Sequence, residues 1–136
     1  MTSSATCQVP LDIPRLATAG AFLEALAAQD FRRLAATLSP VVALRALVPG
    51  GFREWDGRGD TTSAFATWFG DTTSFELLEA VVGEVGVRLH LQWRVRLSAD
   101  RLGEGWFQVE QQAYADTDER GQIVKLRVLC SGYCPE

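Results

Sequence analysis

The clearest pattern in the chain is a strict alternation of apolar and polar residues over residues 87–97, VRLHLQWRVRL. The aliphatic residues and Trp93 share one parity, whereas His90, the single histidine, shares the other with three arginines. A period of two predicts a strand that buries one face. We therefore expect the row containing Trp93 to point into a core and His90 to point away from it.

Helical spacing appears nearer the N-terminus. Residues 14–28 carry apolar side chains three and four positions apart, which predicts an amphipathic helix. Asp30 is a typical N-cap for a second, shorter helix, which ends at the Ser-Pro pair of residues 39–40. A third helix is predicted over residues 59–70, with Asp60 or Thr61 as its cap.

The remaining segments alternate in polarity or are rich in β-branched residues, and most are separated by short turns. They predict strands at residues 41–48, 52–57, 74–82, 87–98, 106–116 and 122–130. Helices grouped toward the N-terminus and strands joined by short turns indicate an α+β domain with a curved antiparallel sheet. We expect residues 1–13 to form a tail and residues 14–136 to form one domain.

Composition narrows the range of partners. The chain has 136 residues, 47% hydrophobic content and a net charge of −4, which argue for a globular domain and against nucleic acid or an anionic membrane as partner. No apolar run approaches the roughly 20 residues of a membrane helix, and the N-terminus lacks a secretory signal. Cys7, Cys130 and Cys134 are an odd set with no zinc-like spacing, so we expect reduced thiols in a cytoplasmic protein.

Three stretches resemble the nuclear transport factor 2-like (SnoaL-like) superfamily. They are AFLEALAAQDFRRLAATLSPVVALRAL, DGRGDTTSAFATWF and QQAYADTDERGQIVKLRVLCSG, which together extend over residues 21–132. The resemblance implies a cone-like fold, a cystatin-like α+β roll in which three helices pack inside a bent sheet. It also implies a pocket at the wide end and a homodimer through the convex face. The excess of arginine over lysine separately suggests a bacterial source. The superfamily includes isomerases, cyclases, hydrolases and non-catalytic proteins, so the fold alone does not assign an activity.

The chemistry of ketosteroid isomerase, a member of that superfamily, does not carry over. The resemblance places the positions of the catalytic base, the tyrosine and the second acid on Ala46, Phe22 and Ala113, all of them apolar. The Asp-Arg-Asp group of the related epoxide hydrolases is not recognisable either. With one histidine and no spaced carboxylates, the sequence predicts no metal site and no cofactor.

Side chains that would face the inside of the cone are candidates for a ligand pocket. Gln111 is its clearest polar group: a buried amide either bonds a neighbour or orients a ligand oxygen. Arg45 lies in a run that is apolar on both parities, so its direction stays open. Trp68 and the other aromatic residues of this region either fill the core or line the pocket. The candidate ligand-binding residues are Phe22, Arg45, Trp55, Phe65, Phe69, Trp93, Gln111 and Cys130.

The opposite parity is a mixed charged and aromatic face. Exposed aromatic residues among polar ones suggest a partner surface, although a solvated face with stray aromatics is the alternative. The expected homodimer surface contains His90, Arg94, Trp106, Glu110 and Tyr114.

Two functions, and a third possibility, are consistent with the sequence. The first is a domain that binds a small apolar or aromatic molecule in the cone. The second is a cofactor-free SnoaL-like enzyme, of the polyketide cyclase or isomerase type, that works by shaping a reactive substrate. A structural dimerisation module would need no cavity at all.

Overall fold

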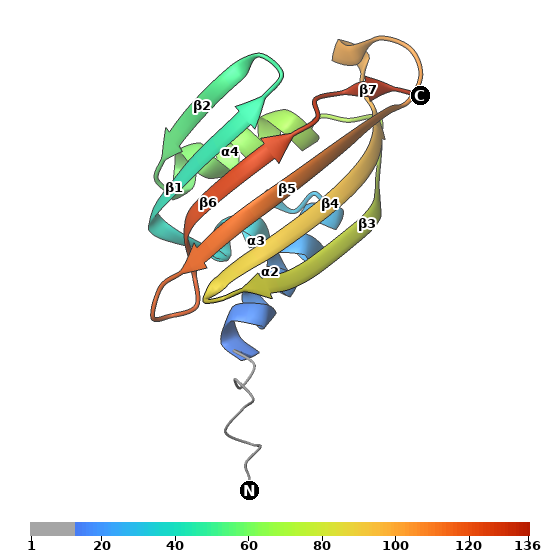
Figure 1. Ribbon diagram of the computed structural model, residues 1–136. Helices are drawn as coiled ribbons and strands as arrows, with labels where there is room; N and C mark the ends of the chain where they lie inside the picture. Colours follow the sequence, from blue (N-terminus) through green and yellow to red (C-terminus); the bar gives the residue numbers. More distant parts are fainter. Residues whose placement is uncertain (1–12) are drawn as a thin grey trace, which may run out of the picture.

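The computed structural model describes residues 13–136 as three α-helices packed on one face of a bent sheet (Figure 1). The helices are α2 (Ile13–Ala27), α3 (Phe31–Ala36) and α4 (Arg58–Phe69). The strands are β1 (Leu38–Val48), β2 (Gly51–Asp56), β3 (Ser74–Val85), β4 (Arg88–Ser98), β5 (Phe107–Thr117), β6 (Ile123–Cys130) and β7 (Cys134–Pro135), with a 3-10 turn, η1 (Asp100–Leu102), between β4 and β5. The predicted α+β class and cone-like sheet are confirmed.

The strands follow the order β2-β1-β6-β5-β4-β3, and β7 adds to the free part of β5. All neighbours are antiparallel except β1 and β6, so the predicted curved antiparallel sheet contains one parallel pair. A parallel pair needs a long connection, and here the chain between β1 and β6 includes α4 and four other strands. No helix among residues 13–136 is long and apolar enough to cross a membrane.

Alternation on β4 places its side chains as predicted. The exposed fraction is 0% for the inward row Leu89, Leu91, Trp93, Val95 and Leu97. His90 lies on the other face, where its ring packs on that of Tyr114 at 4.9 Å between centroids. The register pairs Trp93 with Gln111 on β5, so both side chains point to the concave side of the sheet.

Three aromatic rings form the centre of the core. The Phe22 ring from α2 lies 5.5 Å from that of Phe65 on α4 and 5.6 Å from that of Trp93 on β4. Phe65 meets Trp93 at 6.4 Å. Because all three are fully buried, helices and sheet are joined here without space for a ligand. We call this cluster of Phe22, Phe65 and Trp93 the packed end.

Of the two predicted helix caps, one agrees with the structure and one does not. Asp30 caps α3 as predicted, accepting a hydrogen bond from the backbone N–H of Arg33 at 3.1 Å. The cap of α4 is Gly57, with no side-chain hydrogen bond, so the expected cap at Asp60 or Thr61 is wrong. Gly57 has φ of 92°, a conformation that glycine adopts without strain, and it lets the chain turn directly from β2 into the helix.

Candidate functional site

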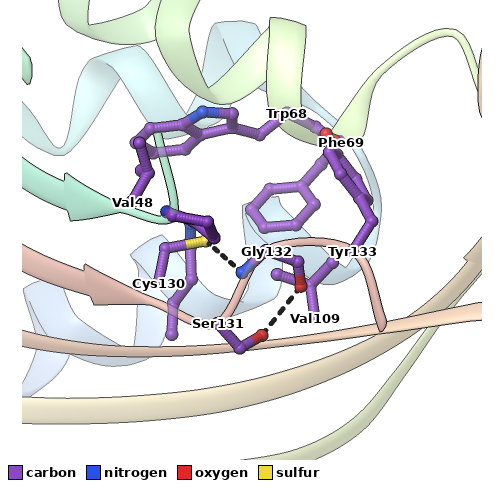
Figure 2. A pocket seen from close by; sticks show the side chains of 10 residues that line it. Val48, Trp68, Phe69, Val109, Cys130, Ser131, Gly132 and Tyr133 are labelled. Atoms are coloured by element: carbon purple, nitrogen blue, oxygen red, sulfur yellow. Dashed lines mark hydrogen bonds between the residues drawn. The ribbon is translucent and has the colours of Figure 1, made fainter. Parts of the chain in front are cut away.

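A cavity of about 560 Å³ opens at the end of the sheet where β1 and β6 finish (Figure 2). Its lining residues come from four places in the fold: the β1–β2 turn, the last turn of α4, the start of β5, and the segment after β6. They are Val48, Pro49, Trp68, Phe69, Val109, Gln111, Cys130, Ser131, Gly132 and Tyr133. We call this cavity the hollow end.

The cavity runs from an exposed mouth to a buried inner part. Pro49 and Ser131 are exposed, whereas Phe69, Val109 and Gln111 have 2% or less of their surface accessible. Most of the lining is apolar, and none of the ten residues carries a formal charge. A concave apolar site with few polar groups is the usual form of a small-molecule pocket.

Residues 131–136, the C-terminal strap, form one wall of the mouth. The strap is held by β7, which pairs with β5, and by the backbone N–H of Ser131, which donates to the carbonyl of Glu110 at 2.9 Å. Gly132 has φ of 77°, and a Cβ at this position would lie 2.6 Å from Cγ of Pro49. Only glycine therefore lets the strap approach the β1–β2 turn so closely.

Tyr133 fixes the strap to the end of α4. Its hydroxyl donates to the backbone carbonyl of Trp68 at 2.6 Å and accepts from Arg101 at 3.2 Å. Arg101 also donates to the carbonyls of Thr67 and Trp68, which are free at the helix C-terminus. The Tyr133 hydroxyl is therefore engaged in hydrogen bonds that hold the cavity wall in place.

Gln111 is the most deeply buried polar residue of the lining. Its Oε1 accepts a hydrogen bond from the Nε1–H of Trp93 at 3.0 Å. The carboxamide Nε2 is buried and has no hydrogen-bond partner within residues 13–136. Neighbouring Cys130, which faces Gln111 across the β5–β6 pair, accepts from the backbone N–H of Gly132 through its Sγ at 3.4 Å.

The structure brings three of the candidate ligand-binding residues together at the cavity: Phe69, Gln111 and Cys130. Phe22, Phe65 and Trp93 instead fill the packed end. Trp55 lies beyond the cavity wall, with its ring edge-on to that of Trp68 at 5.5 Å.

Arg45, whose direction the sequence left open, lies on the outer face of the sheet. It forms ion pairs with Glu54 at 2.9 Å and Asp56 at 3.0 Å on the neighbouring strand β2. The alternation of buried and accessible residues along β1 points its side chain away from the cavity, and the inner neighbours Leu44 and Ala46 are fully buried. Arg45 therefore does not contribute a positive charge to the cavity.

Sequence reasoning missed the strap and the turn that it touches. The strap residues that line the cavity follow the last predicted strand, and they show no periodicity from which their position in the fold could be predicted. They are Ser131, Gly132 and Tyr133. The one available signal was the Gly-Tyr pair, because a glycine at the end of a strand often marks a close approach of two backbones.

The outer face carries paired charges at one side and exposed apolar residues at the other. Arg94 pairs with Glu110 at 3.2 Å, and the Arg96 guanidinium stacks 3.9 Å over the Trp106 ring. Hydrogen bonds from Arg96, and then from Gln108, lower the pKa of the Glu136 carboxyl. A shallow groove nearby contains the exposed side chains of Leu47, Phe52, Tyr114 and Leu129.

No family model matches the sequence, and no curated protein matches it either. Solved structures do resemble the fold. An epoxide hydrolase from M. tuberculosis is 21% identical, with a TM-score of 0.68 over 90% of this chain and 86% of that one. A Xanthomonas campestris protein provisionally named a polyketide cyclase is also 21% identical. Its TM-score is 0.68, over 85% of this chain and 89% of that one.

A steroid delta-isomerase from Pseudomonas aeruginosa is 20% identical, with a TM-score of 0.64 over 90% of this chain and 83% of that one. At such low identity these likenesses show the fold and not the activity. The chain has the nuclear transport factor 2-like fold, as the three stretches between residues 21 and 132 indicated.

Proposed function

We propose that the protein binds a small apolar or aromatic molecule in the hollow end. The observation that carries this proposal is the cavity of about 560 Å³ with Trp68 and Phe69 in its walls and a neutral, mostly apolar lining. Burying an aromatic ligand there removes apolar surface from water at about 25 cal/mol per Å². Ring faces also provide stacking contacts that aliphatic walls do not.

Binding is favoured over catalysis by the chemistry of the lining. The ten residues around the cavity include no aspartate, glutamate, histidine or lysine that would act as a general acid or base. Ala46 and Ala113, where the isomerase resemblance places two carboxylates, are fully buried in the core. These features support ligand binding over the isomerase chemistry.

A cofactor-free enzyme is the second candidate. It is favoured by the names of the structural neighbours, which include a hydrolase, a cyclase and an isomerase. Such an enzyme would act by holding a reactive substrate in one conformation and excluding water. A purely structural dimerisation module is the third candidate, and it leaves the open cavity without a role.

We keep the cytoplasm as the expected compartment, in line with the free thiols of Cys130 and Cys134.

The proposal includes a homodimer through the outer sheet face. Arg94, Trp106 and Glu110 are engaged within the chain, so we place the centre of the interface at the groove of Tyr114 and Phe52, with Leu47 and Leu129 beside it. Side chains of this size with 37–58% of their surface exposed are typical of an interface core. His90, which stacks on Tyr114, has a buried Nε2 without a partner in the described chain and would lie at the rim.

Native mass spectrometry of the freshly purified protein tests both parts. We expect a dimer that retains a small-molecule adduct. Cys130→Phe, which fills the cavity, should lose the adduct, whereas Cys134→Phe, on an exposed cysteine outside the cavity, should keep it. A monomer without adduct would contradict the proposal, and a dimer that never carries an adduct would favour the structural module.

The dimer surface has its own matched pair of variants. Phe52→Glu should convert the dimer to a monomer, because it places a charge in the centre of the apolar groove. Val87→Glu changes a residue that is 84% exposed in the β3–β4 turn and should leave the dimer intact. Equal effects of the two substitutions would place the interface elsewhere.

A further inference from the structure

We infer that the ligand carries a neutral carbonyl oxygen, which accepts a hydrogen bond from Nε2 of Gln111. This inference rests on the proposed binding function and specifies the chemistry of the ligand. It starts from the unpartnered carboxamide nitrogen, the one buried side-chain nitrogen in the cavity lining, within residues 13–136, that makes no hydrogen bond. An unsatisfied buried donor costs free energy, and a ligand that satisfies it recovers that cost.

The orientation of the carboxamide follows from its neighbour. The indole nitrogen of Trp93 is a donor only, so the Gln111 atom 3.0 Å from it must be the oxygen. The amide cannot be flipped without placing two donors against each other. The hydrogen-bonding group that Gln111 leaves without a partner is therefore an N–H donor and not an acceptor.

The other polar side chains of the lining are engaged or unsuited. The Tyr133 hydroxyl donates to the Trp68 carbonyl, and the Ser131 hydroxyl donates to the Gly132 carbonyl at 2.8 Å. The indole nitrogen of Trp68 lies on the ring edge turned away from the cavity (Figure 2). The thiol of Cys130 is a weak donor. Gln111 is therefore the strong side-chain donor that remains for a ligand.

The neutral lining selects the type of acceptor. A carboxylate or phenolate would be buried without a cation, because no arginine, lysine or histidine is among the ten lining residues. A hydroxyl group would bring a proton of its own that needs a further acceptor in a mostly apolar lining. A ketone, aldehyde or quinone oxygen accepts a hydrogen bond and leaves no donor unpaired.

Two probes of nearly the same shape separate this inference from the proposed function. Fluorene and 9-fluorenone differ by one carbonyl oxygen, and their affinities follow from quenching of tryptophan fluorescence. We expect Gln111→Met to lower the fluorenone-to-fluorene affinity ratio about tenfold, the equivalent of one hydrogen bond. Gln92→Met is the matched control, because this residue on β4 lies on the outer face between the buried Leu91 and Trp93 and outside the dimer groove. It should leave the ratio unchanged.

The infrared spectrum of bound fluorenone needs no variant. We expect its carbonyl band to shift to lower frequency than in an alkane solvent, as hydrogen bonding to Gln111 requires. A band at the alkane position, or equal affinity ratios in the wild type and Gln111→Met, would overturn the inference while leaving the binding function intact. Failure of both probes to bind the wild-type protein would overturn the binding function, and the inference with it.

Discussion

The packed end and the hollow end lie under the same sheet and are built from the same kinds of residue, yet only one is filled. At the packed end, Phe22 of α2 packs against Phe65 and Trp93, and the three rings fill the space between helices and sheet. At the hollow end the facing elements are the last turn of α4 and the C-terminal strap. The strap forms one wall of the mouth, and its one large lining side chain, Tyr133, is bonded to the end of α4.

This difference shows that the cavity depends on which segment covers the sheet more than on the sheet itself. Trp93 and Gln111 are direct neighbours across the β4–β5 pair, and one belongs to the core while the other lines the cavity. The hydrogen bond between them joins the two ends. A ligand bound to Gln111 would therefore be connected to the packed end through Trp93.

The largest expected effect comes from emptying the packed end. Phe65→Ala removes a fully buried ring with two aromatic neighbours in the core cluster, and we expect a loss of about 3–5 kcal/mol in the free energy of unfolding. Val48→Ala, at the half-buried wall of the hollow end, should cost about 1 kcal/mol or less. Urea denaturation of the two variants measures both values, and similar losses would contradict the distinction between the two ends.

The next effect concerns the approach of the strap to the β1–β2 turn. Gly132→Ala introduces both a positive-φ strain and a contact with Pro49, and we expect a loss of about 2–3 kcal/mol. Gly103→Ala is the matched control: its φ is 89°, and no atom lies within 4 Å of an added Cβ. This control should lose about 1 kcal/mol in the free energy of unfolding, from backbone strain alone. Equal losses in the two variants would show that the contact with Pro49 does not matter.

Periodicity predicted the parts of the fold where one face is buried. Alternation over residues 89–97 placed Trp93 inside and His90 outside, because a strand against helices must bury one parity. The direction of Arg45 was not readable, since its strand is apolar on both parities. The true partner of that side chain is a pair of carboxylates on β2, a feature of register that local sequence does not encode.

The candidate site was harder to predict than the fold. Aromatic residues at helical spacing are more often core than pocket, and only packing decided that Phe65 fills the core while Phe69 lines the cavity. Gln111 was identified because a polar residue stood on an apolar parity. The strap was missed, since residues 131–136 have no repeating pattern and take their place from long-range contacts.

A smaller effect sharpens the account of the strap. Tyr133→Phe removes the hydroxyl that bonds the carbonyl of Trp68 and the guanidinium of Arg101, and we expect a loss of about 1 kcal/mol. Tyr114→Phe, on the outer face, provides a comparison within the same chain, with an expected change of less than about 0.5 kcal/mol. If the two thermal-stability changes are equal, Tyr133 does not hold the strap to α4.

The smallest effect is a pH dependence at the end of the strap. Arg96 and Gln108 hold the pKa of Glu136 below its usual value of 4.5, so the carboxylate stabilises the folded state above that pH. The contribution is lost as the pH falls through the lowered pKa. We expect the stability difference between the wild type and Glu136→Gln to be small at neutral pH and to vanish in acid. A difference that grows on acidification would contradict this assignment.

The most direct test of the central claim is a titration of the ¹⁵N-labelled protein with 9-fluorenone, followed by amide chemical shifts. The account predicts that the largest changes gather at the hollow end, at Phe69, Val109, Gln111 and residues 130–133. Phe22 and Phe65 of the packed end should change little. Largest changes on the outer face of the sheet, or none at saturating ligand, would contradict the claim that this cavity is the binding site.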